Sequence, residues 1–277
     1  MASFGRLLLA LGIITAAGLS LAVGGIRVSA RDVAWIAGTS DSSSAEADVY
    51  SRYLQRHRVH RLAGGLLGIL FAIIVGTRWY SGSVSFGIGT NSPLADVLFC
   101  GLSGVLVGAF SAETFRLSEP PSATISASLT EHAGVARPQL IRVARVIILG
   151  ALVGSALIAA TGNGLTPLWI AIGGLLVALV AEATQSAITG RRRPVLSDEA
   201  QVVDLRIRSF ASTSIARLQL SAAVLTATWV VSQVPRADDV PLTPVQALAV
   251  IAGFFITVVL LHRASPRPPR KWIAGPS

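Results

Sequence analysis

A row of apolar segments with arginines between them constrains this chain more than any other feature. A membrane-spanning helix needs about 20 predominantly apolar residues. Only 13% of the residues are charged, whereas soluble domains carry about 25%. Seven segments have the required length and character, at about 5–26, 62–79, 94–112, 143–161, 167–187, 214–234 and 244–261. The sequence therefore predicts an all-α fold, a polytopic transmembrane bundle of seven helices.

The basic residues predict how this bundle is oriented. Arginine and lysine are retained on the cytoplasmic side of multi-pass proteins. Of the 23 basic residues, 20 lie in or beside the segments 27–61, 113–142, 188–213 and the tail 262–277. The other three are Arg6, Arg78 and Arg236. We therefore expect the four segments on the cytoplasmic side, the N-terminus outside, the C-terminus inside, and a bacterial plasma membrane as the location. The Pro- and Arg-rich tail should be disordered.

Two alternatives concern the organisation of the helices. Three of them open with a hydroxyl residue and then proline (Ser92-Pro93, Thr166-Pro167, Thr243-Pro244), a pattern that suits the N-cap and first helical position. The chain thus reads as one helix plus three hairpins, either an ancient repeat or a common requirement of helix starts. The first segment also resembles a signal peptide, with Ser20-Leu21-Ala22 near its end, but cleavage would leave the basic segment 27–61 outside.

The inner segments carry amphipathic helix signals. Ser43 and Glu46 have the spacing of a capping box. A helix from about 44 to 61 would bring Val49, Tyr50, Tyr53 and Leu54 together, and another would begin at Ser197. We expect both to lie on the inner leaflet as interfacial helices. Basic residues expected to contact anionic headgroups are Arg52, Arg56, Arg58, Arg61, Arg191, Arg192 and Arg193.

Glu182 is the most informative polar residue, because it lies about two turns inside its helix from the inner surface. Acids at that depth pair or face a cavity. One interpretation is a proton or cation site. The other is a structural ion pair with Arg145 or Arg217. Glu113 lies nearer the boundary, where solvation is its expected state, and we include it with these three residues as a candidate buried polar site.

The remaining motifs favour no enzyme. His57 and His60 could share a helix face, but their arginine neighbours would repel a metal ion, so we predict neither metal nor cofactor. The sequence contains no GxxxxGK[ST], HExxH or GxSxG motif. Cys100 is the only cysteine, which excludes an internal disulfide. Basic residues that flank apolar segments argue against nucleic-acid binding.

Glycines occur in GxxxG spacing at Gly64-Gly68, Gly104-Gly108 and Gly150-Gly154. Small residues at this spacing allow helix backbones to approach closely. They predict packing within the bundle or, alternatively, association with a second copy of the chain.

The arginine-rich inner loops, the Ala, Gly, Val and Leu helices and the stretch from Arg193-Pro194 to Arg217-Leu218 resemble the uncharacterised multi-pass membrane proteins of actinobacteria. This resemblance implies no activity. The leading hypothesis is a non-enzymatic membrane subunit or scaffold that acts through its basic cytoplasmic face. Its partners would be anionic lipid and a membrane or cytoplasmic protein, with a homo-oligomer as a further candidate. The alternatives are a transporter or permease component for a small solute or cation, and a membrane-embedded enzyme.

Overall fold

The computed structural model describes residues 27–38, 43–79, 93–117, 137–162, 164–190, 198–234 and 244–265. These residues form seven α-helices and no strand. The helices are α2 (Ala30–Ala37), α3 (Ser44–Trp79), α4 (Pro93–Leu117), α5 (Pro138–Ala160), α6 (Thr166–Gly190), α7 (Asp198–Ser232) and α8 (Pro244–Arg263). Helices α3 to α8 correspond to the second to seventh predicted spans, although α5 and α7 end one and two residues before the predicted ends, at Ala160 and Ser232. The first predicted helix at 5–26, the loop arginines 191–193 and most of the tail lie outside the described residues.

Five of the described helices, α3, α5, α6, α7 and α8, are long and apolar enough to cross a membrane. Helix α4 contains a shorter apolar stretch, Phe99–Glu113. Helices α4 and α8 begin at Pro93 and Pro244, where the missing N–H of proline leaves no intrahelical bond unmade. The chain therefore has the composition and the helix lengths of a membrane-embedded bundle.

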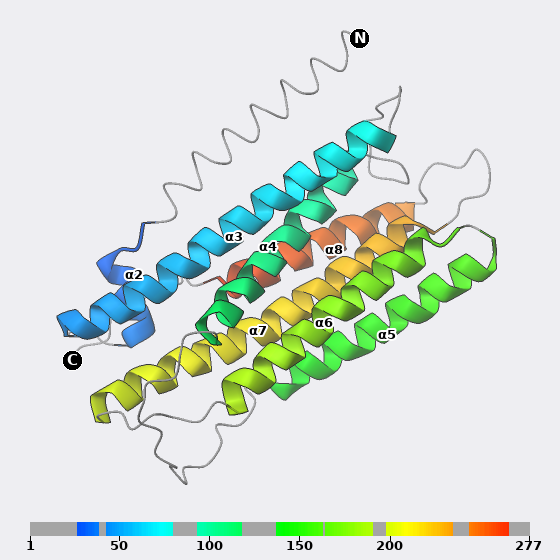
Figure 1. Ribbon diagram of the computed structural model, residues 1–277. Coiled ribbons are helices and arrows are strands. Elements are labelled where there is room, and N and C mark those ends of the chain that lie inside the picture. The colour runs from blue at the N-terminus through cyan, green and yellow to red at the C-terminus, as the bar shows by residue number, and fades with distance from the viewer. Residues whose placement is uncertain are drawn as a thin grey trace.

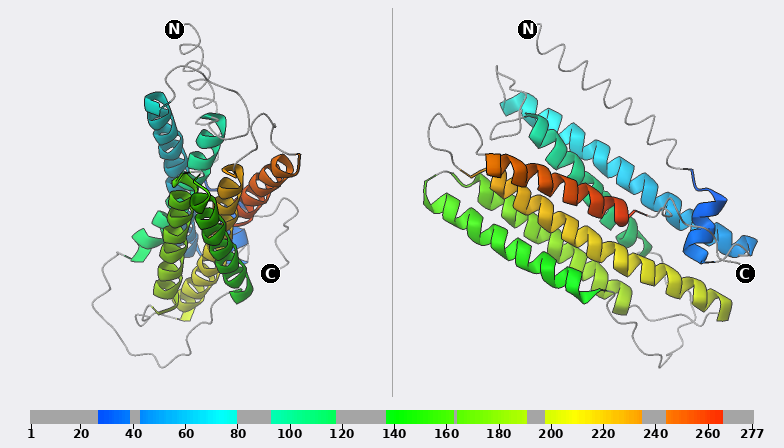
Figure 2. Two further views of the ribbon diagram at one scale, coloured as in Figure 1. Left: turned by 90° about the vertical axis from the view of Figure 1, so that its right-hand side faces the viewer. Right: turned by 180° about the vertical axis from the view of Figure 1, so that it is seen from behind.

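Helix α7 is the central helix of the bundle. About 67% of its apolar stretch is buried within the protein, against 22–28% for the other four candidate spans. It packs against α5 and α6 on one side (Figure 1) and against α8 on the other (Figure 2). It also carries many small polar side chains. Some of their hydroxyls bond to backbone carbonyls one turn away, as Thr226 does to Ala222, and others to carbonyls of α8, as Ser221 does to Thr257. A central position keeps such groups away from lipid.

Helices α3 and α4 form a second, tightly packed pair (Figure 1). Their backbones touch at glycines: a Cβ atom at Gly64 would collide with the carbonyl oxygen of Gly104, and one at Gly68 with that of Cys100. Two of the three GxxxG motifs therefore pack within the chain. A Cβ at Gly150 or Gly154 would meet nothing within 4 Å, so the third motif has no such contact among the described residues.

At one end of the bundle, α2 covers the first turns of α3 and α7. Helices α3 and α7 have 36 and 35 residues, or about 50 Å each, and so exceed a hydrocarbon core of about 30 Å. Here α2 packs with the first turns of α3 and α7, and we call this part of the protein the α2 unit. It has an apolar cluster of its own, made up of Val33, Ile36, Ala37, Tyr50, Tyr53, Leu54, Val203 and Ile207. The end of the bundle at which it lies is called the α2 end.

The α2 unit corrects the prediction of interfacial helices. Residues 44–61 continue without a break into the apolar part of α3. Tyr50, Tyr53 and Leu54 do gather on one face, but they are buried against α2 and α7 instead of facing lipid. Nothing between residues 44 and 61 interrupts a helix, since that stretch contains neither glycine nor proline.

Helix α2 itself was not predicted, although the sequence contains its signal. Ser29 accepts a hydrogen bond from the Asp32 amide, and the Asp32 carboxylate accepts one from the Ser29 amide, which together form a capping box with Asp at the third helical position. The Asp32 carboxylate also forms an ion pair of 3.0 Å with Arg58 of α3. This pair attaches α2 to the long helix.

Candidate functional site

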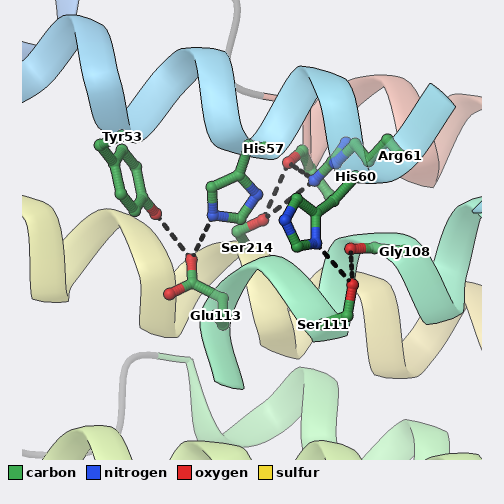
Figure 3. Close-up of polar contacts among 9 residues, drawn as sticks. Tyr53, His57, His60, Arg61, Gly108, Ser111, Glu113 and Ser214 are labelled. Atoms are coloured by element: carbon green, nitrogen blue, oxygen red, sulfur yellow. Dashed lines mark hydrogen bonds and ion pairs between the residues drawn. The ribbon is translucent and has the colours of Figure 1, made fainter. Parts of the chain in front are cut away.

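A buried polar cluster lies between α3 and α4, next to the α2 unit. The Tyr53 hydroxyl donates a hydrogen bond of 2.7 Å to Oε1 of Glu113. His57 Nε2 lies 2.7 Å from the same oxygen, and the side chains of His57 and Glu113 are only 0% and 1% exposed (Figure 3). We call Tyr53, His57 and Glu113 the α3–α4 triad.

Helical spacing and backbone contact assemble the triad. Tyr53 and His57 are four residues apart and therefore share one face of α3, with ring centroids 4.7 Å apart. Helix α4 can present Glu113 to that face because its backbone touches α3 one turn away, where a Cβ at Gly108 would collide with the His60 carbonyl oxygen. His60 also binds α4, with its Nδ1 2.8 Å from the hydroxyl of Ser111.

Arg61 extends this polar row to α7 and α8. Its Nη2 donates a hydrogen bond of 2.6 Å to the carbonyl oxygen of Ala264, just beyond the last turn of α8. The Ser214 hydroxyl of α7 donates a hydrogen bond of 2.8 Å to the same carbonyl (Figure 3). The carbonyls at a helix C-terminus have no intrahelical partner and carry partial negative charge. The Arg61 side chain, which comes from α3, therefore provides a hydrogen-bond donor to the end of α8.

The triad has the chemistry of a proton-sharing site. A carboxylate within hydrogen-bond distance of an imidazole allows one proton to reside on either group. The tyrosine hydroxyl holds the carboxylate in place. His57 Nδ1 is buried and has no hydrogen-bond partner in the described part of the chain. The described residues contain no group of three or more His, Cys, Asp or Glu side chains that could hold a metal ion.

A second cluster joins α5, α6 and α7. Arg145 binds Glu182 through both its Nε and Nη2, at 2.7 and 2.9 Å. The side-chain amide of Gln219 on α7 donates a hydrogen bond of 3.1 Å to the same carboxylate. Of the two arginines proposed as partners for Glu182, the structure brings Arg145 to it. Arg217 instead donates a hydrogen bond of 2.6 Å to the carbonyl oxygen of Arg263.

The basic residues expected at the lipid surface fall into three groups. Arg58 and Arg61 are buried, with 8% and 9% exposure, and bind Asp32 and the end of α8. Their assignment to headgroups was wrong, because each faces a protein acceptor that a single helix does not reveal. Arg52 is exposed and pairs with Asp48, and Arg56 lies 5.9 Å from the Tyr53 ring centre. Arg191, Arg192 and Arg193 are outside the described residues.

Sequence reasoning also missed the pairing of His57 with Glu113. The sequence suggested solvation for Glu113, but α3 packs alongside the last turns of α4 and covers Glu113 with Tyr53 and His57. The available signal was the 53–57 spacing on an amphipathic helix that also carries GxxxG. Along α3 alone, the two histidines suggest only a metal site, because the carboxylate partner of His57 belongs to another helix.

Comparison of the chain with family models, curated proteins and solved structures found no match.

Proposed function

We propose that this chain is a multi-pass membrane protein that works as a subunit or scaffold, with the α2 unit as the surface that meets its partner. The observation that carries this proposal is the extension of α3 and α7 beyond the length that a bilayer requires. The extension is capped by α2, has an apolar core of its own, and is fixed to the bundle by the Asp32–Arg58 pair. A packed extension of this kind, with charged side chains such as Asp48 and Arg52 exposed on it, suits contact with a protein outside the hydrocarbon layer.

The orientation of this extension is part of the proposal. The asymmetry of 20 basic residues against three supports a cytoplasmic α2 end, an external N-terminus and a cytoplasmic C-terminus. Single cysteines at Ser3, Ser44, Ser83 and Ser197 in a Cys100→Ala background would test it. An impermeant thiol reagent applied to intact cells should label positions 3 and 83 only. Labelling of position 44 or 197 would contradict the orientation.

The scaffold role is tested by site-specific photo-crosslinking in cells. Val49 and Gln55 are exposed on the α2 unit, so a crosslinking amino acid there should give one discrete protein adduct. The matched controls are Val153 and Leu157, exposed apolar residues of α5, which should crosslink to lipid only. No protein adduct at either test position, or the same adduct at the controls, would refute the scaffold role.

The α3–α4 triad favours a second candidate, a proton-coupled transporter component. Ionisable residues buried in membrane helices mark proton relays in pumps and transporters, and His57 and Glu113 are both fully buried. In proteoliposomes, a pH-sensitive dye should then report proton movement that Glu113→Gln abolishes. The matched control is Asp48→Asn, which changes an exposed acid of α3. A parent protein without proton movement, or a Glu113→Gln variant with full movement, would exclude this candidate.

A further inference from the structure

Three arginines from three helices converge in the half of the bundle nearer the α2 end. Arg137 precedes α5, Arg217 lies on α7, and Arg263 ends α8. Arg217 donates its 2.6 Å hydrogen bond to the backbone oxygen of Arg263. The positive charges of Arg137 and Arg263 are both close enough to act on the Arg217 guanidinium. We call these three residues the arginine cluster.

The packing next to the cluster shows independently that the start of α5, the middle of α7 and the end of α8 meet. Leu140, Leu220 and Leu260 each lie three residues from one of the arginines, about one turn deeper in the bundle. All three belong to one hydrophobic cluster, centred on Ala144, Ile148, Ala178, Leu220 and Ala223. The arginine cluster therefore lies next to an apolar surface formed by α5, α6, α7 and α8.

No acid of the described chain neutralises these charges. The ion pairs among the described residues join other arginines to Asp32, Asp48, Glu182 and Asp204. Glu182 is the acid on neighbouring α6, but Arg145 and Gln219 already hold it. Arg217 donates one N–H to the Arg263 carbonyl, and a guanidinium has five N–H donors, so others remain for a ligand. The side chains of Arg137 and Arg263 are exposed and donate no hydrogen bond within the described residues.

Like charges held together without a counter-charge repel each other, so an anion that joins them gains energy from all three. Arginine is suited to phosphate, because its planar fork can donate two parallel hydrogen bonds to phosphate oxygens. An anion at this place would have its charge at the level of the arginines and apolar leucine surface one turn away. Among biological anions, a phospholipid has this combination of charged head and adjoining apolar chain. Basic pockets between membrane helices bind such headgroups.

We propose that the arginine cluster of α5, α7 and α8 is a binding site for the phosphate headgroup of an anionic phospholipid in the leaflet at the α2 end. The site is distinct from the surface arginines of the α2 unit, of which Arg52 is exposed and already paired with Asp48. It goes beyond the proposed scaffold role, because it requires only that the bundle is embedded in a membrane.

The full-length protein, purified in a neutral detergent, provides the test. Binding of phosphatidylglycerol, of cardiolipin and of phosphatidylcholine would be measured by native mass spectrometry and by the rise in melting temperature on lipid addition. The variants are Arg137→Gln and Arg263→Gln, alone and together. The matched control is Arg52→Gln, which removes the same charge from an exposed arginine of the α2 unit. Inorganic phosphate is added in a separate arm.

We expect the two anionic lipids to bind and phosphatidylcholine to bind much more weakly. Each variant of the cluster should weaken anionic-lipid binding about fivefold, from roughly 1 kcal/mol per basic residue, and the double variant about 25-fold. Arg52→Gln should change it less than twofold. The melting temperature without added lipid should stay that of the parent, because neither replaced side chain has a hydrogen bond to lose among the described residues.

Three results would overturn the proposal. Equal weakening by Arg52→Gln would show diffuse attraction instead of a site. Equal binding of phosphatidylcholine would show that the headgroup charge is not recognised. Displacement of the lipid by inorganic phosphate at equal concentration would assign the cluster to a soluble phosphate compound. None of these results depends on whether the α2 unit has a protein partner, so the site and the scaffold role can fail separately.

Discussion

Replacing Gly104 by alanine would place a methyl group against the backbone of α3. In the structure, a Cβ at this position would overlap the carbonyl oxygen of Gly64 and press on the Cα of Gly68. Neither contact is with a flexible side chain that could rotate away. Helices α3 and α4 must therefore separate along their whole contact, which loosens the tightest interface of the bundle.

Gly150→Ala is the matched control for this change. Gly150 belongs to the same kind of GxxxG motif and also lies inside a helix, but a Cβ there would meet nothing within 4 Å. Both substitutions gain the helix preference of alanine over glycine, about 1 kcal/mol. That gain cancels when the two variants are compared. The difference left is the cost of overpacking, about 1–3 kcal/mol, so Gly104→Ala should be the less stable protein by that amount.

The assay is reversible unfolding of the full-length protein in mixed detergent micelles, followed by circular dichroism, with the free energy of unfolding taken for each variant. A fluorescent pair on α3 and α4 would show whether the helices move apart. Equal stabilities within about 0.5 kcal/mol, smaller than the overpacking cost, would refute the argument that backbone contact at Gly104 determines this interface. Weakened stability of Gly150→Ala instead would indicate that the third motif is the one in contact.

Two further predictions concern the ion pairs. Glu182→Leu should lower the free energy of unfolding by about 1 kcal/mol, a modest value because the Arg145 and Glu182 side chains are partly exposed. Adding Arg145→Leu should restore the lost stability and adding Arg217→Leu should not, as melting temperatures would show. Burial raises the pKa of Asp32, but hydrogen bonds from Ser29 and the Arg58 guanidinium outweigh burial and hold that pKa below its usual range. A carboxyl with a depressed folded pKa stabilises the protein above its unfolded value of 3.8 and loses that contribution as pH falls through the folded pKa. Hydrogen exchange of α2, corrected for intrinsic rates, should therefore show protection that is constant near neutral pH and falls below about pH 4. Asp32→Asn should weaken protection at pH 7 and remove this acid dependence, and an unchanged profile would show that the Asp32–Arg58 pair does not hold α2.

The sequence alone determined the class of the fold and the positions of the described long helices. An apolar stretch of about 20 residues is long enough to cross a membrane. The free energy of transferring it from water into lipid depends on its own residues and not on its neighbours. The starts of α4 and α8 at Pro93 and Pro244 are equally local, because they depend on a missing N–H and a fixed φ angle. Such features can be recognised one segment at a time.

The polar pairings were decided only by the tertiary structure. Glu182 could have met Arg145 or Arg217, and His57 lies 56 residues from its partner Glu113. The choice depends on which helix faces are brought together, and here backbone contact at Gly64 and Gly104 sets that for α3 and α4. A long side chain then binds whichever acceptor the packing presents, as Arg58 does with Asp32. Contact between distant segments is a property of the assembled bundle, so no single stretch of sequence contains it.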